Sequence, residues 1–486
     1  MSDASLVALL LLPSLLGAVL ALASGPRRPV VETVFQSLPF VAFAAALAIA
    51  LRLGQGGPPL VVGMLWRLDA LSAVLAVAIT GVTVLATGGG PRWEESPAMS
   101  ARIRRFRLLQ QVFVTTMLVA VSTNNLGLMW VAIEATTVTS ALLIPFEPTK
   151  ASLEACWKYL LLGSVGIALA FAGTVLAVVD FSSTGGSMER ALDWTSLRAV
   201  APRLHPEVAR LAFVFLLVGF GTKAGLAPMH TWLPDAHSEA PASLSALMSG
   251  VLLAVALYAI ARWKAVIDAA VGAAYSDALL GGVAVASLAI GSFSLVIQRH
   301  YKRMLAYSSI EHMGLAAVGF ALGPAGIFAA LLHLLNHALG KSTAFLLAGR
   351  VLARYRRHDI ESVRGVFRSL PVTASLFAAT MVALVGLPPF GLFLSEVLLL
   401  RAGWVAGRPG LVALVAVLLL VAFGSLVQHG QRMLLGVPAE EVARGERRLA
   451  PLVTLGTPLV VLAWIGVALP PPLERLLSRA AEVLAP

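Results

Sequence analysis

Cysteine and charged residues are both scarce in this sequence of 486 residues. Its one cysteine, Cys156, excludes an intrachain disulfide and any iron–sulfur cluster held by cysteines of this chain alone. Charged residues make up 13% of the chain, against about 25% in ordinary soluble domains. A soluble fold of this length would therefore lack the polar surface that water requires. Hydrophobic residues reach 58% and the mean hydropathy is +0.86, which favours a chain embedded in a lipid bilayer.

Apolar segments recur along the chain at lengths near the roughly 20 residues that a helix needs to cross the hydrocarbon core. This pattern predicts an all-α, polytopic membrane protein with about fourteen transmembrane helices. No positive charge precedes the first segment, so we expect an uncleaved helix there rather than a signal peptide. The expected spans are 5–24, 31–52, 68–88, 107–122, 125–145, 155–179, 208–227, 241–262, 271–296, 304–322, 325–350, 371–400, 409–430 and 450–470.

Arginine and lysine residues gather in the loops that follow the odd-numbered spans, for example Arg104, Arg303 and Arg356. Cytoplasmic loops of membrane proteins are enriched in these residues. We therefore expect a multi-pass protein of the cell membrane with both termini on the non-cytoplasmic side. The net charge of +11 is read in this way as a topology signal and not as a nucleic-acid-binding surface.

Two of the predicted spans contain helix breakers. Gly225 to Pro228, with Pro234 soon after, interrupts the seventh span, and Gly386 to Gly391 interrupts the twelfth. Paired interruptions at corresponding positions of two repeats are typical of transporter sites. We expect helices 1–3 in residues 1–106, a first five-helix repeat in 107–262, a second repeat in 271–430, and helix 14 with a tail in 450–486.

Ionisable residues fall inside several predicted spans. A charge at the bilayer centre costs roughly 2.5–3.5 kcal/mol on insertion scales, so such residues should face the protein interior and have partners. Glu134 lies in the middle of the fifth span, and Lys223 lies just before the first break. One interpretation is a static ion pair between two helices. The other is a proton carrier, because a buried lysine changes its proton affinity readily when a carboxylate moves.

The eleventh span holds His333, His337 and Lys341 at the spacing i, i+4, i+8. This spacing places the three side chains on one stripe of a helix, over about 12 Å. Histidine can accept a proton on one ring nitrogen and release one from the other, so the stripe predicts a proton path. A zinc site at the two histidines is the alternative. No third ligand is evident in the sequence, and we predict neither a metal nor a cofactor.

Further polar residues lie close to the two breaks. Glu396 follows the second break and is either a buried proton carrier or a carboxylate that reaches the membrane surface from a helix end. Four residues after the first break are metal ligands by type. We expect them to line the mouth of the seventh helix instead; they are His230, Asp235, His237 and Glu239.

Three stretches hold specific motifs: Lys223 to Pro241, Lys302 to Gly314, and Gly386 to Glu396. At these residues the chain resembles the antiporter-like membrane subunits of respiratory complex I, of membrane-bound hydrogenases and of multisubunit cation/proton antiporters. The resemblance covers roughly residues 65–435. Within it, the segment Ser-Ser-Ile-Glu-His-Met-Gly is most similar to the F component of hydrogenase-4 and formate hydrogenlyase complexes.

The resemblance implies two inverted five-helix repeats and assigns roles to particular residues. It makes Glu134 and Lys223 a coupling pair and Glu396 the terminal proton carrier. It also makes His333, His337 and Lys341 the central axis. We further expect Glu311 and His312, in the second motif, to line the channel.

The chain departs from the family pattern at one position. Many of these subunits have a lysine in helix eight, where this chain has Ala254. The connection from Lys223 to the central axis must then pass through water, His230 or His237, or be weakened.

These features predict a proton-translocating membrane subunit of a hydrogenase-4-like or complex I-like oxidoreductase. Its expected partners are other membrane subunits, a peripheral redox module that holds all redox centres, and the lipid bilayer. One alternative is a subunit of a multisubunit Na⁺/H⁺ antiporter. Another is a structural anchor for a peripheral enzyme, although an anchor has no reason to bear the insertion cost of a row of titratable groups.

Overall fold

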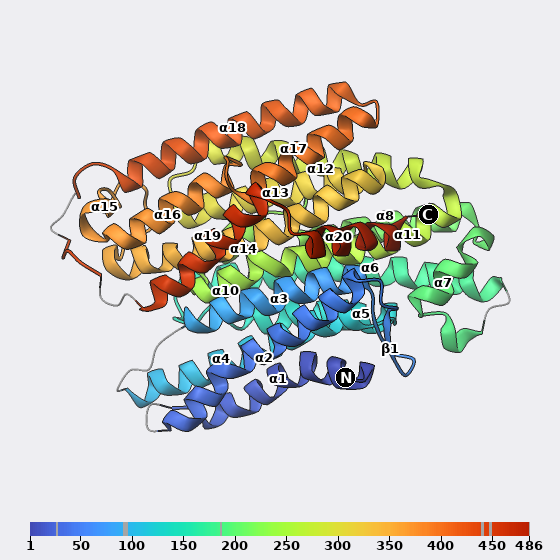
Figure 1. Ribbon diagram of the computed structural model, residues 1–486, viewed down its shortest axis with the longest axis horizontal. Coiled ribbons are helices and arrows are strands. Elements are labelled where there is room, and N and C mark those ends of the chain that lie inside the picture. The colour runs from blue at the N-terminus through green and yellow to red at the C-terminus, as the bar shows by residue number, and fades with distance from the viewer. Residues whose placement is uncertain (26–27, 91–95, 185–186, 439–441, 447–449, 486) are drawn as a thin grey trace.

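The computed structural model describes residues 1–486 apart from 26–27, 91–95, 185–186, 439–441, 447–449 and 486 (Figure 1). Most of the described chain is helical and very little of it is strand, which confirms the all-α prediction. Every predicted span coincides with one helix or with successive helices.

The first six spans are continuous helices. Asn125, whose side-chain oxygen accepts a hydrogen bond from the amide of Leu128, starts a new helix and so divides the fourth span from the fifth. The helices are α1 (Asp3–Ala23), α2 (Pro29–Gly54), α3 (Ala70–Gly88), α4 (Pro97–Ser122), α5 (Leu126–Ala141) and α6 (Lys150–Ser183).

The seventh span is broken where its glycine and proline predict. Helix α8 (Pro206–Ala224) ends at Gly225, whose φ of 71° is a left-handed conformation that glycine adopts without steric cost. The chain resumes as α9 (Trp232–Glu239). The eighth span runs through α10 (Ala242–Leu247), the π-helical turn η3 (Met248–Leu252) and α11 (Leu253–Val271).

The twelfth span is broken in the same manner. Helix α16 (Pro371–Leu384) stops before Gly386, which has a φ of 68°, and α17 (Gly391–Val405) follows. The other helices of this half are α12 (Ala273–Val296), α13 (Tyr301–Phe320), α14 (Gly323–Tyr355), the short α15 (Val366–Ser369), α18 (Pro409–Leu434) and α19 (Ala450–Val467).

Several elements were not predicted. Strands β1 (Leu60–Val62) and β2 (Trp66–Leu68) form an antiparallel hairpin with Leu60 opposite Leu68. Helix α20 (Pro471–Leu484) follows α19 at a bend of 78° and packs its apolar face against α2, α3 and α14. Between α6 and α8 lie α7 (Trp194–Val200) and two 3₁₀ turns, Met188–Arg190 and Ala201–Arg203.

Within the described residues, seven helices are long and apolar enough to cross a membrane alone, and the bent pair of α19 and α20 is an eighth candidate. The other predicted spans are broken, shorter or more polar. Helices α5 and α16, for example, have 16 and 14 residues. Short and broken helices at membrane depth need protein or water around their free backbone groups. Their presence therefore marks the interior where the polar residues lie.

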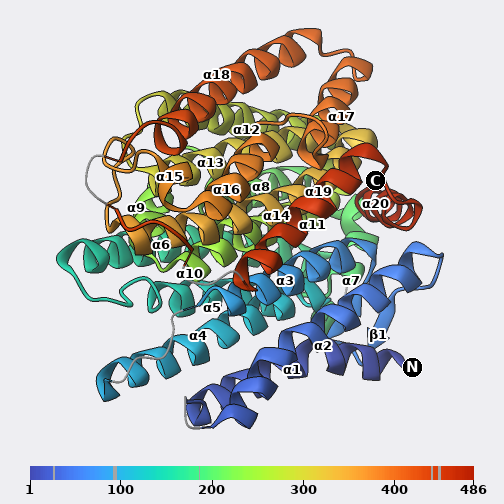
Figure 2. The same cartoon turned by 60° about the vertical axis from the view of Figure 1, so that its left-hand side comes forward.

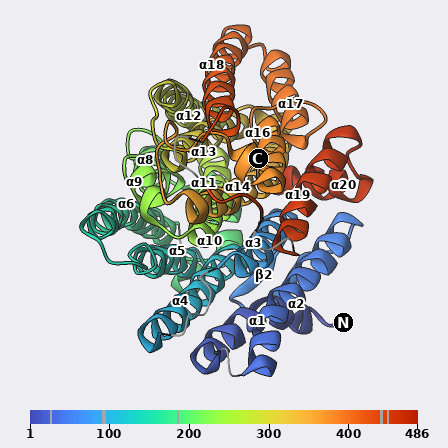
Figure 3. The ribbon, with the colours of Figure 1, turned by 90° about the vertical axis from the view of Figure 1, so that its left-hand side faces the viewer.

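The long helices run side by side in a bundle (Figure 1). Figure 3 looks along the bundle and shows α11 and α14 in the middle, with α1 and α2 at one edge and α18 at the opposite edge. Both ends of the chain lie at the same end of the bundle in Figures 1 and 2. The central helix α14 carries the histidine stripe, so the candidate site lies deep inside the protein.

Candidate functional site

Lys223 is fully buried in the last turn of α8, directly before the first break. Its ammonium group donates a hydrogen bond of 2.9 Å to the hydroxyl of Tyr159 on α6, and the Nζ atom lies 4.8 Å from the centre of that ring. The Tyr159 hydroxyl also contacts the hydroxyl of Ser140 on α5, at 2.8 Å. Three helices thus meet at one buried cation.

Small residues bring α6 and α8 together at this point. A Cβ atom on Gly219 would lie 2.5 Å from the backbone nitrogen of Ala170, and one on Gly166 would lie 2.6 Å from Cβ of Thr222. Atoms cannot approach so closely, so only glycine fits at either position. This close packing sets the distance between Tyr159 and Lys223.

Glu134 lies on α5, partly buried, close to the same cluster. Its carboxylate accepts hydrogen bonds from Thr137 at 2.9 Å and from Ser164 at 3.1 Å. No ion pair within 4.0 Å joins it to Lys223, although both residues are described. Lys223 is bonded to Tyr159, whereas Glu134 is bonded to Thr137 and Ser164, so a static ion pair does not describe this arrangement.

Lys341 is the corresponding buried cation in the second half of the protein. It is fully buried in α14, and its ammonium group donates to the carbonyl of Leu305 at 2.9 Å and to the hydroxyl of Ser308 at 2.6 Å. Both acceptors belong to α13. Glu311, one turn after Ser308 on that helix, is also buried.

The histidine stripe of α14 is joined by a histidine from α13. Nδ1 of His312 lies 3.1 Å from Nε2 of His333, and the ring centre of His312 lies 5.2 Å from that of His337. On its other side, Nδ1 of His333 lies 3.0 Å from the hydroxyl oxygen of Ser395 on α17. His312 therefore connects the two histidines of α14, a place that the helical spacing in the sequence did not reveal.

Glu396 lies beside the second break. A Cβ atom on Gly386 would lie 2.0 Å from one carboxylate oxygen of Glu396, so the carboxylate fills the space that a side chain at Gly386 would need. One possible ligand atom from each of Glu396, His312 and His333 lies within 4.8 Å of the others. The carboxylate is thus turned back toward the break and the histidines and does not extend from a helix end.

The four polar residues after the first break do not form one cluster. Asp235 makes ion pairs with Lys158 at 3.2 Å and with Arg303 at 2.6 Å. His237 is fully buried and stacks on Phe345 of α14, with ring centres 4.8 Å apart. His230 and Glu239 are partly buried.

Helix α9 links the two halves of the site. Near its start, Trp232 packs on Tyr159, with ring centres 4.5 Å apart. Near its end, His237 packs on Phe345, one turn after Lys341. Within the described chain, neither ring nitrogen of His237 has a hydrogen-bond partner. Ala254 of α11 is buried and brings no polar group to this region.

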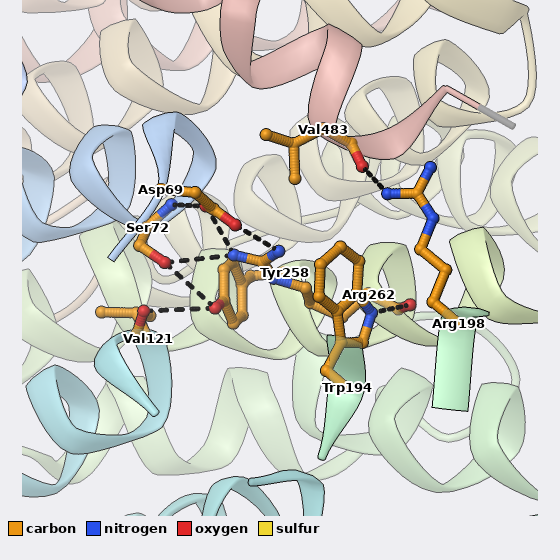
Figure 4. Close-up of polar contacts among 8 residues, drawn as sticks. All are labelled: Asp69, Ser72, Val121, Trp194, Arg198, Tyr258, Arg262 and Val483. Carbon is orange, nitrogen blue, oxygen red and sulfur yellow. Dashed lines mark hydrogen bonds and ion pairs between the residues drawn. The ribbon is translucent and has the colours of Figure 1, made fainter. Parts of the chain in front are cut away.

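A second buried polar cluster, shown in Figure 4, was not predicted. The guanidinium of Arg262 on α11 bonds both carboxylate oxygens of Asp69, at 2.6 and 2.7 Å, and is packed between the rings of Trp194 and Tyr258. Asp69 is also the residue that caps α3. The bidentate pair joins α3 to α11, in the middle of the bundle.

Figure 4 also shows Arg198 of α7 next to Val483 of α20. Its guanidinium donates to the backbone carbonyls of Val483 and Ala485. The thiol of Cys156, on α6 close to Tyr159, lies 3.2 Å from the carbonyl oxygen of Ala141. These contacts fix elements around the site without adding titratable groups to it.

Comparison with known proteins gives consistent matches. Residues 123–422 match the family described as NADH:quinone oxidoreductase/Mrp antiporter, transmembrane. The hydrogenase-4 component F homolog of Methylacidiphilum infernorum is 40% identical over 374 residues, which are 76% of this chain and 77% of that protein.

Solved structures share the fold. A chain of the membrane-bound sulfane sulfur reductase, an archaeal respiratory membrane complex, superimposes with a TM-score of 0.87 at 24% identity over 99% of this chain and 97% of that one. A chain of respiratory complex I from Thermus thermophilus gives 0.83 at 24% identity, over 99% of this chain and 100% of that one.

Proposed function

The chain belongs to the NADH:quinone oxidoreductase/Mrp antiporter transmembrane family, and we propose that it carries protons across the membrane as one subunit of a hydrogenase-4-like or complex I-like oxidoreductase. Other membrane subunits and a peripheral redox module are its proposed partners. The observation on which the proposal rests is the series of buried and partly buried titratable groups from Lys223 to Glu396. An anchoring subunit would gain nothing from their insertion cost.

The partners of the two buried lysines support proton transfer. Within the described residues, Lys223 and Lys341 have no ion-pair partner within 4.0 Å and are bonded to hydroxyl and carbonyl oxygens instead. In a medium of low dielectric constant, a carboxylate that moves by a few ångströms changes the stability of such a cation strongly. We propose that Glu134 acts in this way on Lys223, and Glu311 on Lys341.

The proposed path in the second half runs through the three histidines. From Lys341 a proton passes to Glu311 or His337, then to His312, across the 3.1 Å contact to His333, and finally to Glu396. Each imidazole accepts a proton on one nitrogen and releases one from the other. Glu396, next to the exposed linker of the second break, is the proposed exit.

We propose His237 as the connection between the two halves. The family lysine of helix eight is replaced here by Ala254, so another polar group is needed. His237 lies on α9, which contacts the Lys223 cluster through Trp232 and the Lys341 region through Phe345. Its two unpartnered ring nitrogens are available to water or to a passing proton.

The sidedness of the chain is part of the proposal. The basic loops face the cytoplasm. The end of the bundle at which both chain termini lie faces the non-cytoplasmic side. Reaction of Gly63→Cys, in the β1–β2 hairpin, with an impermeant thiol reagent added outside the cell tests this assignment, with Gln298→Cys, between α12 and α13, as the cytoplasmic counterpart. Modification of Gln298→Cys alone would contradict it. Cys156→Ser serves as the background for both variants.

Redox-driven proton uptake tests the function. Lys223→Ala and Lys341→Ala are introduced into the assembled complex, and proton uptake into membrane vesicles is followed with a pH-sensitive dye while electron transfer is recorded in parallel. We expect uptake to be lost in both variants. Lys150→Ala, which changes an exposed lysine at the start of α6, is the matched control. Unchanged proton uptake in the two buried-lysine variants refutes the proposal. Proton uptake that requires sodium and is not supported by potassium assigns the chain to sodium/proton exchange instead.

A further inference from the structure

We propose that His312, His333 and Glu396 form a binding site for one divalent transition-metal cation of the Zn²⁺ type. The three residues come from α13, α14 and α17, and one possible ligand atom from each lies within 4.8 Å of the others. They are not adjacent in the sequence. The zinc alternative that the sequence suggests pairs His333 with His337, whereas the fold brings His312 into that place.

The hydrogen bonds around His333 fix which of its nitrogens has a free lone pair. The hydroxyl of Ser395 donates its only proton to the carbonyl of Leu392, at 2.9 Å. With that proton committed to Leu392, we assign Nδ1 of His333, 3.0 Å away, as the donor to this hydroxyl. Nε2 of His333 then has no proton, and its lone pair points toward His312. A neutral imidazole held in one tautomer by an outer partner is the form in which histidine binds metals.

The second histidine also has an outer partner in place. With this tautomer of His333, Nδ1 of His312 carries the proton that it donates to His333 at 3.1 Å. Within the described residues, its Nε2 has no hydrogen-bond partner, and this atom lies 3.6 Å from a carboxylate oxygen of Glu311. A shift of the proton from Nδ1 to Nε2 frees Nδ1 for the metal. His312 stays neutral, and its new N–H faces Glu311.

The spacing of the ligand atoms suits a tetrahedral ion. Zinc binds histidine nitrogen at about 2.0–2.1 Å, so two ligands of a tetrahedron are about 3.3 Å apart. The two imidazole nitrogens lie 3.1 Å apart. One possible ligand atom from each of the three residues lies within 4.8 Å of the others, so a closure of at most about 1.5 Å brings such a group to tetrahedral spacing. The fourth position is then free for water.

The ligand types select the metal. Two imidazoles with one carboxylate favour Zn²⁺ and similar transition metals over Mg²⁺ and Ca²⁺, which prefer an all-oxygen environment. The same lone pairs serve the proposed proton path, so a bound ion would block that path. The expected inhibition of proton transfer by zinc rests on the proposed function, whereas zinc binding to the three residues does not.

Zinc binding to the purified, detergent-solubilised complex tests the site. The complex is dialysed against Zn²⁺, and its metal content is measured by mass spectrometry for the wild type, His333→Gln, Glu396→Gln and the control His337→Gln. We expect the wild type and His337→Gln to hold one more Zn²⁺ per complex than His333→Gln, with at least tenfold weaker binding in Glu396→Gln. Equal zinc content in the wild type and His333→Gln overturns the proposal. Assembly and electron transfer show that each variant is folded.

A second measurement separates the metal site from proton transport. Zn²⁺ is titrated into wild-type vesicles during redox-driven proton uptake, and we expect inhibition over the concentration range in which the His333-dependent ion binds. Binding without inhibition keeps the metal site and contradicts the proton path through His333. If Lys223→Ala loses proton uptake but the wild type binds no zinc, the proposed function stands and the metal site is overturned.

Discussion

The ammonium group of Lys223 is hydrogen-bonded to the Tyr159 hydroxyl and not to a carboxylate. Tyr159 in turn contacts Ser140, on the helix that carries Glu134. The phenol therefore connects the cation to the helix that carries the group proposed to regulate it. This arrangement makes Tyr159 the most informative position in the first half of the protein, although a single tyrosine in an apolar segment gave no signal in the sequence.

Tyr159→Phe should weaken proton uptake while it leaves the packing of the ring on Trp232 intact. A hydrogen bond to a charged group contributes about 1.5–3 kcal/mol, which corresponds to a change of roughly 10–100-fold in the protonation equilibrium of Lys223. Uptake at fixed electron-transfer rate is the measurement. Tyr275→Phe, which removes a hydroxyl bonded to a backbone carbonyl near the protein surface, should have no effect. If Tyr159→Phe and Tyr275→Phe take up protons at the same rate, the hydroxyl of Tyr159 has no part in the path.

Gly386→Ala should abolish proton transfer at the second break. The new methyl group would overlap the carboxylate of Glu396, at 2.0 Å, and displace it from the histidines. The backbone also has a φ of 68°, which costs an alanine about 1–2 kcal/mol. Gly407→Ala has the same backbone strain, with a φ of 71°, and no atom near its methyl group. Proton uptake in Gly386→Ala should match that of Glu396→Gln, whereas Gly407→Ala should pump normally.

Asp69→Ala should destabilise the protein more than any exposed ion-pair variant. It leaves Arg262 buried without its carboxylate, and the loss of one partner of a buried pair costs about 3–5 kcal/mol. Asp3→Ala breaks the pair with Arg52, in which the two side chains are 31% and 34% exposed, and should cost at most about 1 kcal/mol. Thermal unfolding of the solubilised protein measures both. Similar midpoints for the two variants would contradict the structural role of Asp69.

His237→Phe should uncouple the two halves while it retains an aromatic ring next to Phe345. We expect proton uptake to fall at least tenfold with electron transfer still measurable, because His237 is the titratable group proposed to replace the helix-eight lysine of the family. His429→Gln changes a buried histidine on α18 that bonds the carbonyl of Leu295, and it should pump like the wild type. Full uptake in His237→Phe would exclude this residue as the link.

The breaks and the fold class were predictable because glycine and proline act locally. Gly225 and Gly386 end their helices with the left-handed backbone that their identity allows, and the structure confirms both interruptions. The stripe of His333, His337 and Lys341 followed from the helical period in the same way. The roles of these residues stay predictions, but their burial on one central helix was readable from the sequence.

The rest depended on which helices meet in space. His312 joins the stripe only because α13 packs against α14, and Asp69 meets Arg262 across 193 positions of the sequence. Helix α20 was missed because Pro470 and its neighbours ended the expected last span. The sequence nevertheless contains the pattern of an amphipathic helix there, because leucines recur at helical spacing at Leu473, Leu476, Leu477 and Leu484.

Cys156, the one thiol of this chain, lies on α6 three positions before Tyr159 and against the carbonyl of Ala141. A fluorescent or nitroxide reporter attached there would sit next to the first buried lysine without any engineered residue. Its signal should change when the neighbouring helices shift during turnover. The protein thus contains a natural point of attachment for observing the coupling step while the complex works.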